Sequence, residues 1–426
     1  MRNPLFRPRA LVAAGTAAVL ALGAAACGDS GESDADVTFW HIQNEDPMKS
    51  TWQALADEWS EESGQTVEVS AIAVEDFKTR LSTQTQAGDL PDLYNTWGGG
   101  VLAEQVEAGL VRDISGLPCL DKVNPIALES YTIDGKLYAI PFDQGVVGFW
   151  YNKDLFAQAG ITDTPTTWAE FTEDVQTLKD AGITPIALGG GDKWPIHYYW
   201  TYLAMRLVGL DGLAAAAESG DFSGPGFVQA GQLLADLAAM EPFQEGFESA
   251  TYGEADGEAA VMGEGLAAME LMGQWGPQVQ RDASGTEGIG ESLAFFPFPA
   301  VEGGPGTATE FLGGGGGFAA GADAPDEIED FMCYLLEEQN QARVVKDGNM
   351  STVAANPEAV LPEPNHEQQA VIDALATATD TQLYLDQAYP PSIGSTINDA
   401  SQGLVLGELT PEDFVAMVNE AWAAEQ

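Results

Sequence analysis

Predicted strands and helices alternate between residues 37 and 100, and this alternation limits the fold more than any other feature of the sequence. Residues 37–40 form a short apolar run before the polar segment 41–46, which is typical of a strand. Apolar side chains then recur every three or four positions from Met48 to Trp59 and predict one face of a helix. By the same reasoning a second strand spans 67–71, a second helix runs through Phe77 and Leu81 to Gly88, and a third strand begins at Leu93. A β-α-β-α-β order predicts a parallel sheet with helices on its faces, and hence an α/β fold.

The carboxyl ends of these strands are where a ligand is expected. In parallel sheets ligands bind just outside those ends, and the polar segments 41–46 and 95–100 lie at two of them. The binding candidates in the first segment are His41, Gln43, Asn44 and Glu45. The alternative is that a carboxylate or amide of residues 44–46 only caps the helix that begins at Pro47.

The charge balance excludes two classes of partner. The chain of 426 residues carries 66 Asp and Glu against 16 Lys and Arg, a net charge of −50. A broad nucleic-acid-binding surface needs clustered cations, and adsorption of the folded body onto anionic lipid needs them too. With 45% hydrophobic and 9% aromatic residues the chain has enough apolar material for a packed core, so wholesale disorder is also excluded.

The N-terminus has the pattern of an export signal. Basic residues precede an apolar run that ends in small residues directly before Cys27. This ending resembles the lipobox of bacterial lipoproteins, although Ala24 stands where that motif usually has Leu. We therefore predict a signal peptide at 1–26 and a lipidated tether at 27–36, with Cys27 as the lipidated residue. The alternative is plain secretion with an unmodified cysteine.

The remaining cysteines are Cys119 and Cys333. In an oxidising extracellular setting they form a disulfide or stay as buried thiols, and the sequence alone leaves both open. The sequence contains no Cys/His cluster with zinc-ligand spacing, because His41, His197 and His366 are scattered. We therefore expect neither a metal nor a cofactor.

A second αβ series is expected after residue 146. Thr167 and Glu170 form a T-x-x-E capping box at the start of a helix. The triple glycine at 189–191 predicts a turn before an aromatic-rich helix that Pro195 opens. The C-terminal part of the chain is expected to be mainly helical.

Four segments carry a family resemblance: LPDLYNTWGGG (90–100), DGKLYAIPFDQGVVGFWYNKDLFAQAGI (134–161), PTTWAEF (165–171) and ELMGQWGP (270–277). In this order they resemble the sugar-binding family of extracellular solute-binding proteins of ABC importers, which includes the maltodextrin-binding proteins. The stretch YNKDLFAQAG (151–160) is the most diagnostic. The resemblance spans nearly the whole chain after the predicted signal peptide.

The resemblance implies a two-lobed periplasmic-binding-protein-like fold of type II, in which hinged α/β lobes close on a ligand in the cleft between them. Lobe 1 would comprise residues 37–146 plus 311–350, and lobe 2 residues 147–310 plus 351–426. Asp143 would then lie near the first crossover, where both lobes contribute to the site. Its alternative role is a hydrogen bond in the hinge.

Aromatic side chains are the other expected part of a sugar site, because the ring faces of sugars pack on flat π-surfaces. The candidates are Trp97, Trp194, Trp275 and Tyr389, with His197 on the aromatic-rich helix. Trp275 lies in GQWGP, a loop that the resemblance implies carries a stacking aromatic. Packing under its loop is the alternative for Trp194, and a satisfied core histidine is the alternative for His197.

The resemblance implies a monomeric receptor rather than an enzyme, with no catalytic residues. It would be exported, anchored by lipid to the outer face of the cytoplasmic membrane, and would deliver a short oligosaccharide to the membrane permease of an ABC importer. The segments WHIQNEDP and GGGDKWPIHYYW resemble receptors for plant-derived disaccharides and favour xylobiose or a xylo-oligosaccharide. The alternatives are a receptor of the same fold for another disaccharide, a polyamine or a peptide, and an exported glycoside hydrolase. A glycoside hydrolase needs a pair of carboxylates, but in so acidic a chain some pair always has suitable spacing for this. The presence of such a pair is therefore no support for the hydrolase.

Overall fold

The structure, a computed structural model, describes residues 35–425. The predicted signal peptide, Cys27 and residues 28–34 of the predicted tether lie outside the described residues. Between residues 35 and 425, no helix has the length and apolar character needed to cross a bilayer. The same part of the chain holds no group of three or more His, Cys, Asp or Glu side chains arranged to bind a metal ion.

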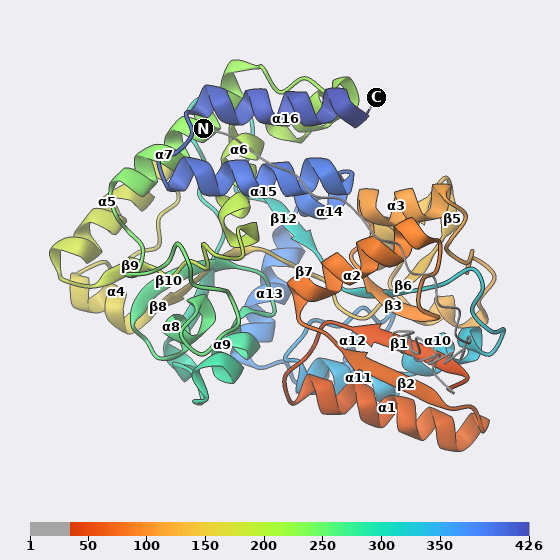
Figure 1. The fold of residues 1–426 in the computed structure, drawn as a ribbon. Helices are drawn as coiled ribbons and strands as arrows, with labels where there is room; N and C mark the ends of the chain where they lie inside the picture. The colour runs from red at the N-terminus through yellow and green to blue at the C-terminus, as the bar shows by residue number, and fades with distance from the viewer. Residues whose placement is uncertain (1–34, 426) are drawn as a thin grey trace, which may run out of the picture. The chain divides into compact units, whose positions relative to one another are not determined.

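A five-stranded sheet, in the order β2-β1-β3-β13-β6, forms the first part of the fold (Figure 1). Its strands are β1 (Val37–His41), β2 (Val67–Ala71), β3 (Leu93–Thr96), β6 (Ala139–Pro141) and β13 (Gly317–Ala320). β1 pairs in parallel with β2 and β3, whereas β13 is antiparallel to β3 and β6. The helices that follow the parallel strands are α1 (Met48–Ser63), α2 (Val74–Ala87) and α3 (Gly99–Glu107). The predicted β-α-β-α-β order is confirmed, and α1 ends at Gly64 in the left-handed conformation (φ 77°).

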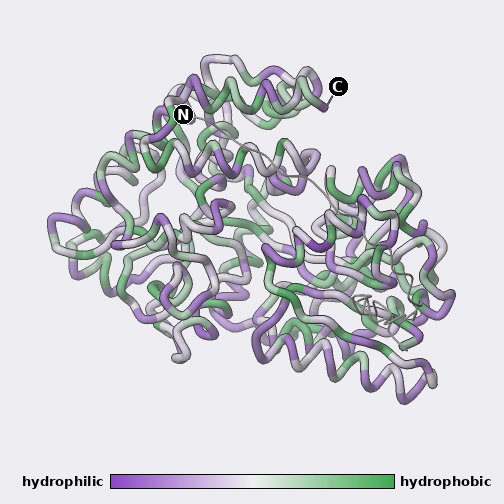
Figure 2. Tube along the Cα trace, viewed as in Figure 1, coloured by the Kyte–Doolittle hydropathy of each residue, from purple (hydrophilic) through white to green (hydrophobic). Residues whose placement is uncertain are grey.

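We call the buried residues on this sheet the first core. Phe39 of β1 lies edge-on to Trp52 of α1 and to Phe318 of β13, with ring centroids 6.2 and 4.9 Å apart. Hydrophobic and hydrophilic residues alternate along α1, as expected for a helix that covers one face of a sheet (Figure 2). A disulfide joins Cys119 to Cys333, whose Cα atoms are 5.5 Å apart. The other elements of this part are η1 (Pro118–Lys122), η2 (Pro125–Tyr131), β4 (Thr132–Ile133), β5 (Lys136–Leu137), α10 (Ile328–Leu335) and α11 (Glu338–Asp347).

A four-stranded sheet, in the order β11-β8-β10-β9, forms the second part. Its strands are β8 (Gly148–Asn152), β9 (Thr184–Ile186), β10 (Ala267–Met272) and β11 (Leu293–Phe296). The associated helices are α4 (Lys153–Ala159), α5 (Trp168–Asp180), α6 (Trp194–Ser219), α7 (Pro225–Ala239), α8 (Glu258–Gly263), α9 (Gly276–Ser284) and η3 (Gly290–Ser292). The predicted capping box is confirmed: Thr167 accepts from the Glu170 amide, and the Glu170 carboxylate accepts from the Thr167 amide.

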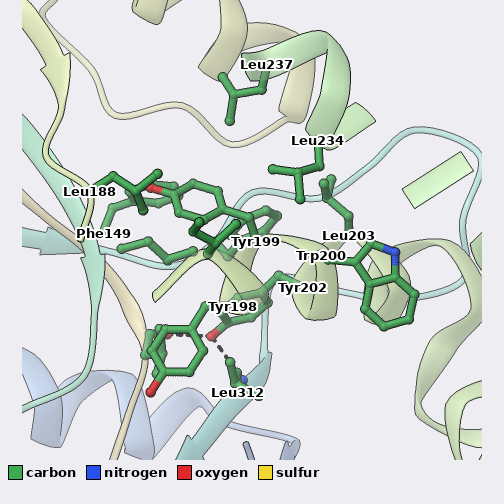
Figure 3. Packing of buried hydrophobic residues seen from close by; sticks show 14 of the residues in the cluster. Phe149, Leu188, Tyr198, Tyr199, Trp200, Tyr202, Leu203, Leu234, Leu237 and Leu312 are labelled. Atoms are coloured by element: carbon green, nitrogen blue, oxygen red, sulfur yellow. Dashed lines mark hydrogen bonds between the residues drawn. The ribbon is translucent and has the colours of Figure 1, made fainter. Parts of the chain in front are cut away.

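We call the buried residues around this second sheet the second core. The aromatic-rich helix α6 runs through it, and Figure 3 shows Tyr199 beside Phe149 of β8 and Leu188. The ring centroids of Tyr199 and Phe149 are 6.0 Å apart. Tyr202 accepts a hydrogen bond of 3.0 Å from the amide of Leu312 (Figure 3). The helix therefore fixes aromatic side chains on several of its sides at once.

Three short strands link the two parts of the fold: β7 (Gly145–Val146), β12 (Glu310–Gly314) and β14 (Asp380–Gln382). β12 lies in the middle, antiparallel to β7 and parallel to β14. The helices toward the C-terminus are α12 (Pro357–Val360), α13 (His366–Thr377), α14 (Leu385–Ala388), α15 (Pro391–Val405) and α16 (Pro411–Glu425). The mainly helical C-terminal part is thereby confirmed. The chain passes between the two cores next to Asp143, before β7, and next to Gly314, at the end of β12, and again between Val353 and Val371.

Candidate functional site

Five aromatic side chains form a continuous series of contacts, which we call the aromatic row. Its members in order are Trp275, Tyr384, Tyr198, Trp194 and Tyr252, and their successive ring centroids are 5.9, 5.6, 5.5 and 5.1 Å apart. The two tryptophans are half-buried and the three tyrosines are buried. The row therefore joins the two tryptophans that the sequence singles out in this part of the chain.

The loop after β10 positions Trp275. The indole folds back over Gly273, where a Cβ would lie 2.3 Å from the Trp275 ring, so only glycine fits there. Trp150 Nε1 donates to the Gly273 carbonyl at 2.9 Å and fixes the loop on β8. Trp194 begins α6 directly before Pro195, whose fixed φ suits the first turn of a helix.

A buried polar group lies at the Trp275 end of the row, around Asp143. Gln274 Nε2 donates to Asp143 Oδ2 at 2.5 Å, and Gly145 makes room for the amide, since a Cβ there would lie 2.2 Å from Gln274 Oε1. Burial raises the pKa of Asp143 to about 6, although the Gln274 hydrogen bond opposes the rise. The charge of Asp143 adds to burial in raising the pKa of Tyr384.

Several oxygens around Asp143 are buried and have no hydrogen-bond partner within residues 35–425. They are Asp143 Oδ1, Gln274 Oε1, Tyr384 Oη and Ser351 Oγ. The backbone amide of Ser351 also faces the Asp143 carboxyl. Buried polar atoms are normally paired because an unpaired one costs about 1–3 kcal/mol. These acceptors and hydroxyl groups are therefore suited to the hydroxyls of a ligand held against the aromatic row.

A charged group lies near the middle of the row and connects the two cores. Lys78 Nζ of α2 is 3.3 Å from Asp386 Oδ2 of α14 and 3.2 Å from Glu75 Oε1. His197 Nε2 is 4.0 Å from Asp386 Oδ1, and the His197 and Tyr198 rings are 4.8 Å apart. Burial opposes ionisation of Asp386, but Lys78 and His197 outweigh it and lower the pKa of Asp386. Burial lowers the pKa of His197, although the charge of Asp386 opposes the fall.

Trp97, the candidate from the first sheet, adjoins this charged group. Its half-buried ring is 6.0 Å from the Phe77 ring, and Lys78 Nζ is 6.0 Å from its centroid. The first two glycines that follow Trp97 pack closely on protein. A Cβ on Gly98 would lie 2.1 Å from Ser130 O, and one on Gly99 2.5 Å from Gln387 O. The glycines allow α3 to pack closely on η2 and α14.

The four candidates after β1 lie in different surroundings from one another. His41 is fully buried; burial and the charge of Lys49 lower its pKa to about 3, and neither ring nitrogen has a partner among the described residues. Gln43 Oε1 accepts from Trp52 Nε1 at 3.1 Å. Asn44 is half-buried and Glu45 is exposed. No ring contact or hydrogen bond of the described chain connects these four to the aromatic row, so their role in binding stays a prediction.

The structure also favours some of the structural alternatives. Asp46 Oδ1 accepts from the Ser50 amide at 3.2 Å in the first turn of α1, which is the capping role foreseen for this segment. Tyr389 is 7% exposed, and its ring centroid lies 5.4 Å from that of Trp422 and 6.3 Å from that of Phe222. These are contacts of a core residue. The binding role of Tyr389 stays a prediction without a contact to the aromatic row.

Sequence reasoning did not select Tyr198, Tyr252, Tyr384, Gln274, Ser351, Lys78 or Asp386 as members of the site. Two of them carried a usable signal. Tyr198 lies on the helix marked as aromatic-rich, and Gln274 precedes Trp275 inside the ELMGQWGP segment. Lys78 and Asp386 are 308 positions apart, so only the tertiary fold shows that they meet.

The architecture defines the class of the protein. A chitin oligosaccharide binding protein has a TM-score of 0.83 to this chain at 25% identity, with 91% of this chain and 98% of that chain covered. A structure from work on xylan utilization by the thermophilic bacterium Caldanaerobius polysaccharolyticus has a TM-score of 0.82, also at 25% identity, with 90% and 99% covered. The expected two-lobed α/β fold of type II periplasmic solute-binding proteins is therefore confirmed.

The family follows from the sequence match. The model of the bacterial extracellular solute-binding protein family matches residues 43–342, and the chain belongs to this family. This membership confirms the prediction of a binding protein rather than an enzyme.

Two relatives illustrate the range within the family. The multiple sugar-binding protein of Streptococcus mutans is 28% identical over 198 residues, 46% of this chain and 46% of that protein. The match thus spans just under half the length of that relative. The melibiose/raffinose/stachyose-binding protein of Bacillus subtilis is 22% identical over 394 residues, 89% of this chain and 87% of that protein.

Proposed function

We propose that this chain is the sugar receptor of an ABC importer and that it binds a short oligosaccharide along the aromatic row. The observation that carries the proposal is the row itself, with unpartnered buried oxygens around Asp143 at one end. Aromatic faces bind the C–H faces of sugar rings, while carboxylate and amide oxygens accept hydrogen bonds from hydroxyls. Relatives named as sugar-binding proteins support the same ligand class.

The wider role is part of this proposal. The receptor is exported, is anchored by lipid at Cys27 to the outer face of the cytoplasmic membrane, and delivers its sugar as a monomer to the membrane permease. The signal-peptide pattern supports export, and family membership supports an extracellular solute-binding role. Lobe 1 comprises residues 37–146 plus 311–350 and lobe 2 residues 147–310 plus 351–426, a division supported by the two separate cores.

For the ligand itself we propose xylobiose or a short xylo-oligosaccharide. The structural similarity to the chain from the xylan utilization work supports this choice. The similarity to a chitin oligosaccharide binding protein and the relative that binds melibiose, raffinose and stachyose define the competing sugars. A micromolar dissociation constant corresponds to about −8 kcal/mol, which a few stacked rings and hydroxyl contacts can supply.

The test is a thermal-shift and calorimetry panel with the folded body after the predicted lipid anchor. The panel contains xylobiose, xylotriose, cellobiose, maltose, melibiose, raffinose, chitobiose and spermidine. A ligand at 100 times its dissociation constant should add about 2.7 kcal/mol to the free energy of unfolding. We expect the largest shift with a xylo-oligosaccharide. A larger shift with another sugar corrects the ligand, a shift with spermidine alone contradicts the sugar class, and turnover of a bound sugar contradicts the receptor role.

A further inference from the structure

Two glutamates are buried together behind the aromatic row. Glu258 begins α8 and is 1% exposed, and Glu270 lies in the fully buried strand β10 and is 0% exposed. Neither takes part in any ion pair formed within residues 35–425. Buried carboxylates without a counter-charge stay neutral by keeping a proton.

Each glutamate is held by one strong hydrogen bond. The Gly189 amide donates to Glu258 Oε2 at 2.6 Å, and Gln280 Nε2 donates to Glu270 Oε1 at 2.8 Å. The second oxygen of Glu270, Oε2, is buried and has no hydrogen-bond partner among the described residues. Each carboxyl is therefore fixed at one oxygen by a donor from the protein.

The surroundings keep the pair protonated near neutral pH. Burial raises the pKa of Glu258, and the charge of Glu270 raises it further. Burial also raises the pKa of Glu270 to about 8, although the hydrogen bond from Gln280 opposes the rise. The other titratable groups that face the pair are Asp192, Tyr198, Tyr199 and Tyr252. Burial raises the pKa of Asp192 and of the three tyrosines, so the tyrosines stay neutral throughout the range in which the pair titrates.

Both glutamates support segments that carry members of the aromatic row. A Cβ on the glycine that follows Trp275 would lie 3.1 Å from Glu270 Oε1, so this carboxyl packs directly against the Trp275 loop. The amide that follows Glu258 donates to the Tyr252 carbonyl at 3.0 Å, so Glu258 ends the loop that presents Tyr252. Glu270 and Glu258 therefore adjoin the two segments that carry Trp275 and Tyr252.

We propose that Glu258 and Glu270 are both protonated near neutral pH and act as positioning residues that hold Tyr252 and Trp275 in the geometry that binds the ligand. This inference rests on the proposed function, because it takes the aromatic row as the ligand site. When one of the two carboxyls loses its proton at alkaline pH, a charge without a counter-charge forms inside the second core and displaces the segments that carry Tyr252 and Trp275. Ligand affinity is then lost before the protein unfolds.

The test measures the dissociation constant of the best sugar from pH 6 to pH 9.5, together with the Trp275 fluorescence of the ligand-free protein, taken as the difference from Trp275→Phe. If the protein binds the sugar only while the pair is protonated, its affinity for the sugar falls about tenfold at one pH unit above the midpoint of the titration of the pair. The fluorescence should change over the same pH range. Both changes should vanish in the double variant Glu258→Gln/Glu270→Gln, whose amides keep the hydrogen-bond geometry without an ionisable group.

Glu264→Gln is the matched control, because Glu264 is exposed at the end of the same helix α8. It should keep the pH profile of the unmodified chain. A sugar that binds with the same affinity from pH 6 to pH 9.5 overturns the inference and leaves the sugar receptor intact. If no sugar binds at any pH, the proposed function fails, and the fluorescence titration alone decides whether deprotonation of the pair displaces Trp275.

Discussion

The two cores supply different chemistry to the candidate site. The second core supplies all five members of the aromatic row, and it holds the buried Glu258–Glu270 pair. The first core contributes the face with Trp97 and the cation Lys78. Most of the aromatic side chains of the candidate site thus come from the second core, and its positive charge comes from the first. We infer that the second core provides most of the affinity and the first core the contact that joins the two.

The largest expected effect is a loss of stability in the first core when its disulfide is removed. Replacing Cys119 and Cys333 with Ser removes a cross-link between positions 214 residues apart, which should lower the free energy of unfolding by about 4 kcal/mol. The loss should be concentrated in the first core, because both cysteines belong to it. Hydrogen exchange should therefore rise in β1 and α10 more than in β8 and β10. Equal increases in both sheets would show that the cores unfold as one unit.

The next effect concerns the aromatic faces. Trp275→Ala should weaken sugar binding by about thirtyfold, about 2 kcal/mol, because the variant loses a stacking surface and its burial. Trp97→Ala should cost less, since Trp97 has no ring contact to the row. Calorimetry measures both, with Trp168→Ala as control, because Trp168 stacks on Phe171 at 4.9 Å in the core and should change stability alone. A greater loss for Trp97 would reverse the assignment of affinity to the second core.

These residues also show what the sequence can reveal. The strands and helices from residue 37 to 100 follow from local periodicity, and the Thr167 capping box is a local pattern too, so both were predictable. Trp194 could be selected as a candidate because it lies between a triple glycine and Pro195, and Trp275 because its segment carries the family resemblance. Tyr384, Ser351 and Asp386 lie in segments without such marks and reach the site only through the tertiary fold.

A smaller effect is expected from the contact between the cores. Lys78→Met keeps the apolar stem but leaves the Asp386 carboxylate, whose side chain is 8% exposed, without its cation. Because the Lys78 side chain is 27% exposed and partly screened, we expect a loss of about 1 kcal/mol, or about fivefold in affinity. Lys136→Met is the control, since the Lys136–Asp113 pair of 3.0 Å lies away from the row. If both variants bind equally well, the ion pair plays no part in binding.

The smallest expected effect is a fall in sugar affinity at acid pH, which is caused by the protonation of Asp143. Its pKa is raised to about 6 by burial, and sugar hydroxyls hydrogen-bond better to the ionised form. Binding therefore favours ionisation, so affinity should rise with pH, and at pH 6, where about half of Asp143 is ionised, it should be about twofold below its value at pH 7.5. Calorimetry in buffers of different ionisation enthalpy should detect a proton released on binding at pH 6.

Asp143 and the glutamate pair together predict a bell-shaped profile whose two sides can be removed separately. Asp143→Asn should flatten the acid side alone, because the amide keeps a hydrogen-bonding group near Gln274 but does not titrate. The double glutamine variant of Glu258 and Glu270 should flatten the alkaline side alone. If either variant flattened both sides, one titration would control the whole row, and the two groups would have to be treated as a single coupled system across the crossover between the cores.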